Sequence, residues 1–366
     1  MKQKKYRKMI GIIFPYRNRE VERVKRSLDS LSLQENHNFK VIFVDYGSDL
    51  ASSSAIKELI FQYKFASYIY SFSEFQPWSR AKALNIGLKN TTADYVFTAD
   101  VDMIFSPNFI SKLYELRNPL KAYYFKVGFL SEKESKADKK FEDYSIDFNT
   151  GVGAQGLSLF YLKNVEEIGG YDEFLHFWGA EDIDIHERLI RTGTESIFYN
   201  EETLLLHQWH QSYRKSETAV LIEGLQLKGV VQLNHQHLKS NQKNKVTKVN
   251  NEKWGNLISE ADFNELETAD CQITLNNKLE VIDHFLFVEL PQYKDKIVSV
   301  QFTKDDFQDS LKYKVKKLLG KTVPQYYSLK EINDRLLLHI ISFYHTYPYS
   351  FKIDKNLKSI RFKIKK

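Results

Sequence analysis

Short apolar runs alternate with amphipathic segments along the first hundred residues. Runs typical of strands occur at 8–14, 39–44, 66–71 and 95–99, and segments typical of helices occur at 20–33, 53–63 and 79–89. In the first of these helices, Val21, Val24, Leu28 and Leu31 recur at spacings that place them on one stripe. Strands separated by helices predict an α/β fold with a mostly parallel central sheet. Such sheets bind ligands at the carboxyl ends of their strands, so the polar residues that follow each run deserve inspection.

The hydrophobic pattern changes beyond about residue 258. Strand-like runs in the 280s and at 297–302 mix with one helical segment at 329–344, which predicts a small C-terminal α+β appendage. We therefore expect two domains, 1–258 and 259–366. The residues of the second domain do not indicate its role. Two polar stretches stand out: 131–150 is expected to be a mobile surface loop, and 239–251 to lie near the domain end.

Composition limits the compartment and the partners. The chain of 366 residues has one cysteine, Cys271, which excludes an internal disulfide and is typical of a reducing compartment. No stretch approaches the roughly eighteen consecutive apolar residues that span a membrane, so we expect a cytoplasmic protein. The formal net charge of +6 fits an anionic substrate, a membrane surface or nucleic acid. Since no basic-aromatic segment of the nucleic-acid-binding kind occurs, we expect no nucleic acid partner.

The stretch at 352–366 mixes lysine and arginine with apolar residues. One interpretation is a strand whose charged side faces solvent, which is the usual fate of such runs and the favoured one here. The other is peripheral attachment to anionic lipid at the inner face of the membrane.

The tripeptide Asp100-Val101-Asp102 directly follows the apolar run 95–99. If the strand continues, side chains two residues apart lie on the same face, and two like charges there are costly unless a cation lies between them. A divalent ion such as Mn²⁺ or Mg²⁺ carrying a diphosphate suits these hard oxygen ligands. The alternative is an ordinary strand-to-loop junction, where aspartate is common.

Basic residues follow two other predicted elements. Arg17 and Arg19 come just after the first strand, and arginine suits a diphosphate or the polar edge of a base. Arg80 and Lys82 lie near the start of the third helix. Both pairs are equally compatible with plain surface charge at a helix start.

The densest group of polar residues opens a predicted helix at 177–191. Glu181, Asp182 and Asp184 crowd its first turn, next to Trp178 and Gly179. Acidic residues stabilise helix N-termini, so part of this pattern is capping. An aromatic face beside carboxylates also suits a sugar, and one carboxylate could act as a general base toward a hydroxyl.

His207 directly follows the apolar residues 204–206. It could complete a metal site begun by Asp102, because imidazole and carboxylate together suit a divalent transition metal. An ordinary core or surface histidine is the alternative.

Taken together and in order, these segments resemble inverting, metal-dependent GT-A glycosyltransferases. The similarity is greatest to the β-1,4-galactosyltransferase group and to bacterial chondroitin-polymerase-type domains of families 2 and 7, and it covers about 8–258. The segments that carry it are 12–20, 80–88, 100–102, 153–158, 168–172, 178–182 and 251–255. The resemblance implies a Rossmann-like GT-A catalytic domain at 1–258, with 259–366 as an accessory domain.

The resemblance also implies an enzyme that moves a hexose or N-acetylhexosamine from a UDP-sugar to a hydroxyl of a glycan or lipid-linked acceptor, with β-linkage. Asp102 and His207 would bind Mn²⁺ or Mg²⁺, and Asp182 would be the catalytic base. Glu181, with Trp178 and Gly179, would bind the acceptor. The residues implied to hold the nucleotide and donor are Pro15, Arg17, Arg19, Asp45, Arg80, Lys82, Asp100 and Val101.

The chain departs from the galactosyltransferase pattern at three positions. Leu204 stands where that group has a methionine ligand, so His210 or water would have to substitute. Ile183 replaces an acidic residue, which implies different acceptor contacts. Gly153 lies near the place of a bulky aromatic, which leaves room for an N-acetyl group and favours UDP-GalNAc or UDP-GlcNAc over UDP-galactose. The alternative function is a catalytically degenerate module that binds a UDP-sugar or a protein.

Overall fold

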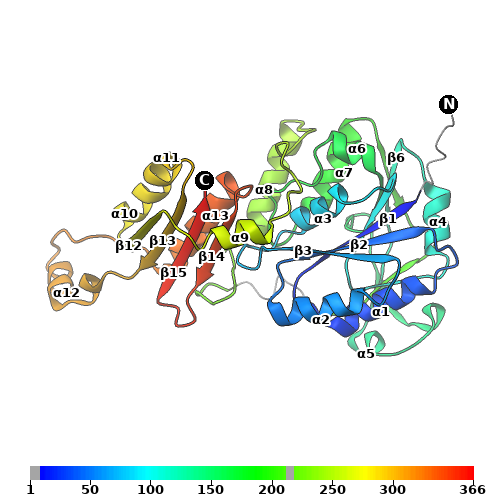
Figure 1. Cartoon of the computed structure of the whole chain (residues 1–366), viewed down its shortest axis with the longest axis horizontal. Helices are drawn as coiled ribbons and strands as arrows, with labels where there is room; N and C mark the ends of the chain where they lie inside the picture. The colour runs from blue at the N-terminus through cyan, green and yellow to red at the C-terminus, as the bar shows by residue number, and fades with distance from the viewer. Residues whose placement is uncertain (1–8, 212–217) are drawn as a thin grey trace. The chain divides into compact units, whose positions relative to one another are not determined.

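The computed structural model describes residues 9–211 and 218–366 and divides into two compact units (Figure 1). The first unit comprises 9–71, 78–211 and 231–257, and the second comprises 72–77, 218–230 and 258–366. The second unit thus takes two short segments from the middle of the chain. Within the described ranges, no helix has the length and apolar character needed to cross a membrane.

A mostly parallel sheet of seven strands forms the centre of the first unit. Its order is β10-β6-β9-β4-β1-β2-β3, and β9 is the strand that runs antiparallel to both of its neighbours. The sheet confirms the α/β prediction. The strands are β1 (Ile10–Tyr16), β2 (Phe39–Tyr46), β3 (Ala66–Ser71), β4 (Tyr95–Thr98), β6 (Lys121–Phe125), β9 (Ser158–Tyr161) and β10 (Glu195–Tyr199).

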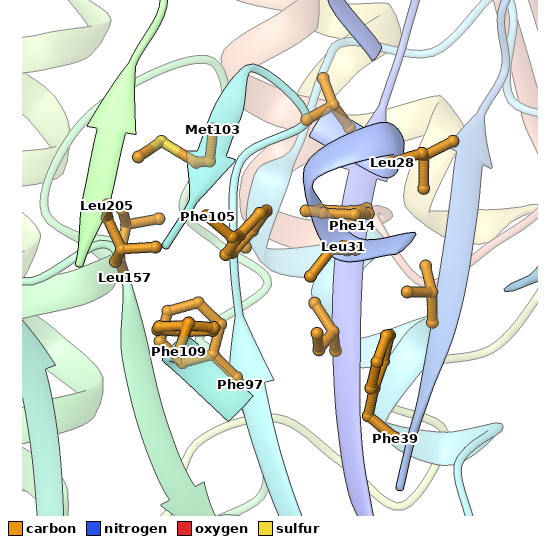
Figure 2. Close-up of a cluster of buried hydrophobic side chains, with 14 of the residues drawn as sticks. Phe14, Leu28, Leu31, Phe39, Phe97, Met103, Phe105, Phe109, Leu157 and Leu205 are labelled. Atoms are coloured by element: carbon orange, nitrogen blue, oxygen red, sulfur yellow. The ribbon is translucent and has the colours of Figure 1, made fainter. Parts of the chain in front are cut away.

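Helices cover both faces of this sheet (Figure 1). Alternate residues of β1 serve the two faces: Phe14 packs in the core with Leu28 of the first helix, and Ile13 packs in a separate core with Leu84. Figure 2 shows the first core, where Phe14 lies beside Leu28 and Leu31 of that helix and Phe97 lies beside Phe109. The helices are α1 (Val21–Ser32), α2 (Leu50–Ile60), α3 (Arg80–Lys89), α4 (Phe109–Leu116), α6 (Leu162–Glu167), α7 (Glu181–Arg191) and α8 (Val230–Lys243).

Capping side chains fix where two of these helices begin. The Asp49 side chain accepts a hydrogen bond from the Ser52 amide at 2.9 Å, so α2 starts three residues before the predicted position. The Ser79 hydroxyl accepts from the Lys82 amide at 3.2 Å and sets the start of α3 as predicted.

A smaller sheet lies within the first unit, in the order β5-β11-β7-β8. Its strands are β5 (Met103–Phe105), β11 (Leu205–His207), β7 (Gly128–Leu130) and β8 (Ile146–Asn149). The prediction of a plain loop at 131–150 was wrong. The segment contains α5 (Glu132–Ser135), a 3₁₀ turn (Phe141–Asp143) and β8, because β8 pairs with β7 and is thereby held in place.

The second unit contains a four-stranded sheet in the order β12-β13-β15-β14, together with helices, as the α+β prediction required. The expectation of a strand in the 280s was wrong. Ile282, Phe285, Leu286 and Leu290 are buried at helical spacing, and the segment forms α10 and a π turn, 285–289. The elements are α9 (Glu260–Glu265), β12 (Cys271–Asn276), α10 (Leu279–His284), α11 (Leu290–Gln292), β13 (Ile297–Thr303), α12 (Leu311–Leu318), α13 (Leu329–Phe343), β14 (Tyr349–Ile353) and β15 (Ser359–Lys365).

Two polar stretches take regular structure. The basic C-terminal stretch becomes β15, with Ile360, Phe362 and Ile364 buried and Arg361 exposed, which matches the strand interpretation. The stretch at 239–251 does not form a boundary throughout, since 239–243 completes α8.

Candidate functional site

The pairing of β5 with β11 brings Asp102 beside His207. His207 pairs with Met103 in the antiparallel register, and the Gln208 amide donates to the Asp102 carbonyl at 3.0 Å. The expectation that a strand would place Asp100 and Asp102 on one face was wrong. Strand β4 ends at Thr98, and both aspartates lie in the turn that leads to β5.

Asp102, His207 and His210 form a compact ligand cluster. Oδ1 of Asp102 lies 3.6 Å from Nε2 of His207, and Oδ2 lies 3.4 Å from Nε2 of His210. The three potential ligand atoms all lie within 4.8 Å of one another. Asp102 is only 4% exposed, and its Oδ1, like Nδ1 of His207, has no hydrogen-bond partner among the described residues.

The chemistry of this cluster fits a divalent cation. A buried carboxylate oxygen without a partner is costly, and a cation would compensate it. Burial lowers the pKa of His207, which favours the neutral imidazole that binds metals. The two imidazoles favour a transition metal over Mg²⁺, which prefers oxygen ligands.

Aromatic packing holds one of the two imidazoles. The ring of Phe129 stacks on His207 with centroids 4.4 Å apart, and Phe148 stacks on Phe129 at 4.6 Å. Phe148 comes from β8 and is 54% exposed. The ordered segment after residue 131 therefore supports the cluster from one side.

Arg80 joins the aspartate turn to the start of α7. Its Nε donates to Oδ1 of Asp100 at 3.0 Å, and its Nη2 donates to the Gly156 carbonyl at 2.8 Å. Its Nη1 lies 3.8 Å from Oε1 of Glu181. Burial alone would raise the pKa of Asp100, but the Arg80 guanidinium outweighs it and lowers that pKa.

Glu181 and Asp182 form an adjacent carboxylate pair at the first turn of α7. Burial, followed by the charge of Asp182, raises the pKa of Glu181 to about 7. Burial also raises the pKa of Asp182. Two neighbouring carboxylates with raised pKa values can take up and release a proton near neutral pH, which is the property that a general base needs.

The loop before α7 has a strained backbone and a helix holds it in place. Phe177, Gly179 and Ala180 have φ angles of 64°, 98° and 79°, which are left-handed values that cost non-glycine residues energy. The side-chain Nδ2 of Asn234, on α8, donates to the carbonyls of His176 at 2.9 Å and Trp178 at 3.0 Å. Trp178 is 38% exposed on this fixed loop.

The residues implied to hold the nucleotide lie at the ends of β1 and β2. The Arg17 guanidinium lies over the rings of Tyr46 and Trp78, at 5.0 Å and 5.7 Å from their centroids. Asp45 is fully buried, where it accepts hydrogen bonds from the Ser48 amide and the Tyr68 hydroxyl, both at 2.8 Å. Its carboxylate is thus engaged within the protein.

The remaining predicted donor residues are spread around this edge. Pro15 is buried in β1, Lys82 is 6% exposed at the start of α3, and Val101 is buried in the aspartate turn. Arg19 is exposed, yet it lies close enough to Asp100 to lower that residue's pKa, as does His207. The charges of Arg19 and His207 thus both act on Asp100.

Sequence reasoning missed several residues that build the site. The Phe129 ring stacks on His207, and the Asn234 side chain donates to two carbonyls of the loop before α7. The Gly156 carbonyl accepts a hydrogen bond from Arg80. None of these residues has a distinctive type or spacing, so the sequence held no signal for the first two. Gly156 does lie inside the 153–158 segment singled out above.

Two family descriptions match this chain. Glycosyl transferase family 2 matches residues 11–148, and the N-terminal domain of galactosyltransferase matches residues 136–210. Together they span β1 through the histidine cluster.

Similar proteins agree with these matches. Human chondroitin sulfate synthase 3 is 23% identical over 51% of this chain and 23% of its own length. Human chondroitin sulfate N-acetylgalactosaminyltransferase 2 is 22% identical over 56% of this chain and 40% of its own length. The match therefore covers less than half of either relative. Among solved structures, the mannosyltransferase PcManGT from Pyrobaculum calidifontis, in complex with GDP-Man and Mn²⁺, aligns with a TM-score of 0.40 and 19% identity over 56% of this chain and 57% of that chain.

The two family descriptions, the chondroitin synthase relatives and the parallel-rich sheet with its clustered site agree with one another. The chain is therefore similar to sugar-nucleotide glycosyltransferases, and its mostly parallel α/β sheet is the architecture that this similarity implies.

Proposed function

We propose that this enzyme is a metal-dependent, inverting transferase that moves a sugar from a UDP-sugar to a hydroxyl of a glycan or lipid-linked acceptor, forming a β-linkage. The observation that carries the proposal is the cluster of Asp102, His207 and His210, with a buried carboxylate oxygen that lacks a partner. The carboxylate pair at the start of α7 supplies the second requirement of the reaction, a base for the acceptor.

Asp102, His207 and His210 would hold the metal, Mn²⁺ or Mg²⁺. When bound, such an ion supplies positive charge that stabilises the departing diphosphate. Leu204 stands where the galactosyltransferase group has its methionine ligand. It is 1% exposed within the apolar core, so it has a packing role here. His210 is then the natural third ligand.

Asp182 would act as the general base. It would take the proton of the acceptor hydroxyl as that oxygen attacks the anomeric carbon, while the bond from that carbon to UDP breaks on the opposite face. One displacement of this kind inverts an α-linked donor to a β-glycoside. Glu181 would bind the acceptor sugar, and the exposed face of Trp178 would pack on its apolar side.

Arg17 and Arg19 would contact the nucleotide. Since both oxygens of Asp45 are engaged by Ser48 and Tyr68, contact of Asp45 with the uracil edge requires one of those bonds to be shared. Arg80 would act through Asp100, which it holds in an ion pair.

The transferred sugar would be an N-acetylhexosamine. Among the described residues, and apart from its two chain neighbours, no heavy atom lies within 4 Å of the position that a Cβ at Gly153 would occupy, which supports room for an N-acetyl group at this loop. One relative is named as an N-acetylgalactosaminyltransferase, which supports UDP-GalNAc as the first donor to test and UDP-GlcNAc as the second.

UDP release from UDP-GalNAc, UDP-GlcNAc, UDP-galactose and UDP-glucose, each with Mn²⁺ and with EDTA, tests this function. A chondroitin oligosaccharide serves as acceptor, and NMR of the product reports the anomer. We expect metal-dependent release from an N-acetylhexosamine donor and a β-linked product. UDP binding without release from any donor would favour the alternative of a degenerate binding module, and an α-linked product would contradict the inverting mechanism.

A further inference from the structure

Helix α12 carries an exposed apolar stripe. Leu311, Val315 and Leu318 are 80%, 51% and 87% exposed, and Leu319, directly after the helix, is 63% exposed. Residues at i, i+4, i+7 and i+8 share one side of a helix. These four side chains, called here the α12 stripe, therefore form one patch that the rest of the second unit does not cover.

The opposite side of α12 is fixed to the second unit. The Tyr313 ring packs edge-on against Phe307 and Tyr326, with centroids 5.8 Å and 5.6 Å apart. The Ser310 hydroxyl caps the helix by accepting from the Tyr313 amide at 3.1 Å. The stripe is thus exposed because the helix is anchored by its other face. A water-soluble helix usually has the reverse orientation.

Lysines surround the stripe. The positions are Lys312, Lys314, Lys316, Lys317 and Lys321, and the sequence from 310 to 325 contains no acidic residue. Among the described residues none of these lysines forms an ion pair, whereas nearby Lys304 pairs with Asp309 at 2.7 Å. The surface is therefore apolar in the middle and uncompensated positive at its edges.

We propose that α12 is a membrane-surface anchor that inserts its stripe into an anionic phospholipid bilayer. A short helix with leucines on one side and lysines on its flanks satisfies both parts of such a surface, the acyl boundary and the anionic headgroups. A second copy of the chain fits less well, because two such surfaces would bring ten lysines together. This inference is independent of the sugar that the enzyme transfers.

The proposal differs from attachment through the basic C-terminal stretch. There, Lys363 pairs with Glu267 at 2.6 Å and Lys365 pairs with Glu265, while the apolar residues of β15 lie in the core. Among the described residues Lys355, Lys358 and Arg361 of that stretch form no ion pair, but its apolar side chains lie in the core and leave little apolar surface for a membrane. Helix α12 combines unpaired lysines with an exposed apolar stripe.

Co-sedimentation of the full chain with vesicles tests the anchor. We expect binding to vesicles of equal phosphatidylglycerol and phosphatidylcholine, loss of that binding at high salt, and little binding to phosphatidylcholine alone. The double substitution Leu318→Ser/Leu319→Ser should weaken partitioning by at least about tenfold, since each leucine buries apolar area in the bilayer. Lys312→Gln/Lys314→Gln, at the two edges of the stripe, should also weaken it by about tenfold or more.

Leu50→Ser is the matched control, because Leu50 is 81% exposed on α2. It should bind vesicles as the unchanged chain does. Circular dichroism of each variant reports folding. The proposal is overturned if the full chain binds neither kind of vesicle, if Leu318→Ser/Leu319→Ser binds like the unchanged chain, or if sedimentation equilibrium finds a dimer that this variant disperses.

Discussion

Glu181 and Asp182 show how two adjacent residues acquire a function that neither has alone. Each is partly buried at the first turn of α7, and the charge of Asp182 adds to burial in raising the pKa of Glu181. Burial also raises the pKa of Asp182. Arg80, 3.8 Å from Glu181, opposes both shifts.

The first prediction concerns the pH dependence of transfer. Because the base must be deprotonated and burial raises the pKa of Asp182, kcat/KM should fall on the acid side at a pH above the ordinary range of an aspartate. Glu181→Gln removes the neighbouring charge and should move this acid limb to lower pH. Glu187→Gln, on the same helix, is the control and should leave the limb in place. An unchanged pH profile in Glu181→Gln would show that the Glu181 carboxylate does not influence the pH dependence of transfer.

The same shift has a consequence for stability. A raised carboxyl pKa means that the folded protein holds its proton at pH values where the unfolded chain, with an ordinary pKa of 4.5, has lost it. The contribution of Glu181 to the free energy of unfolding is therefore largest below pH 4.5 and is lost as pH rises through about 7.

Residue types and order indicated several side chains that the structure brings together, and their roles stay predictions. Asp102, His207, Asp182 and Arg80 were all singled out from the sequence, and the structure brings Asp102 to His207 and Arg80 to Glu181. The supporting contacts could not be predicted, since Phe129 stacks on His207 only because β7 and β11 pair. Burial of Asp45 likewise follows from tertiary packing.

At the scale of elements, α7 depends on a buried ion pair. Nε of Arg188 donates to Asp184 at 2.7 Å, and the two side chains are 0% and 1% exposed. The same guanidinium donates to the carbonyls of Ile168 and Gly170 at 3.1 Å and 2.8 Å. One side chain therefore joins α7 to the turn that follows α6.

The second prediction is that Arg188→Met lowers the free energy of unfolding by about 3–5 kcal/mol, because it leaves Asp184 buried without its cation. Arg191→Met is the matched control on the same helix. Its pair with Glu187 is partly exposed, with side chains 19% and 28% accessible, so the loss should be at most about 1 kcal/mol. Urea denaturation measures both, and equal losses in the two variants would contradict the account.

The third prediction concerns α8 and the loop that carries Trp178. Asn234→Ala removes both hydrogen bonds that hold the carbonyls of His176 and Trp178. We expect the acceptor KM to rise by about tenfold with a smaller change in the donor KM, since two lost bonds of about 1 kcal/mol each loosen the acceptor side. Asn244→Ala, just beyond α8, is the control. Equal changes in both KM values would indicate general destabilisation instead.

The hydrophobic pattern predicted most elements of the first unit. It was wrong or gave no signal in segments that are too short to show a clear periodicity. Strands β1 to β4 were recognised because short apolar runs alternate regularly with amphipathic segments. The 280s were mistaken for a strand because Ile282, Phe285 and Leu286 look like an apolar run until their helical spacing is considered. Strand β8 was missed because it is only four residues long, Ile146–Asn149, and lies in a charged segment, although its apolar and polar residues alternate.

At the scale of the whole molecule, the two units are interleaved along the chain. Residues 72–77 belong to the second unit, where Phe75 stacks on Phe263 and its carbonyl accepts from the Phe351 amide at 2.8 Å. Gln76 donates to the Tyr349 carbonyl at 3.0 Å. The hydrophobic pattern along the sequence predicts a boundary near 258 but does not assign 72–77 to the second unit.

The fourth prediction follows from that interleaving. A fragment that ends at residue 257 removes the Phe263 ring from Phe72 and Phe75 and the Tyr349 carbonyl from buried Gln76. We therefore expect it to aggregate, or to melt several degrees below the first transition of the full chain. Size-exclusion chromatography and thermal unfolding measure this. A monodisperse fragment with an unchanged Tm would show that 72–77 contributes nothing to folding.

The central claim is that Asp102, His207 and His210 form the metal site through which UDP is bound. Calorimetric titration of UDP, with Mn²⁺ and with EDTA, tests it most directly in the unchanged chain, in Asp102→Asn and in His210→Ala, with His284→Ala as the control. The account predicts Mn²⁺-dependent binding in the unchanged chain and the control, its loss in Asp102→Asn, and weakening by about tenfold or more in His210→Ala. Equal, metal-independent binding in all four proteins would contradict it.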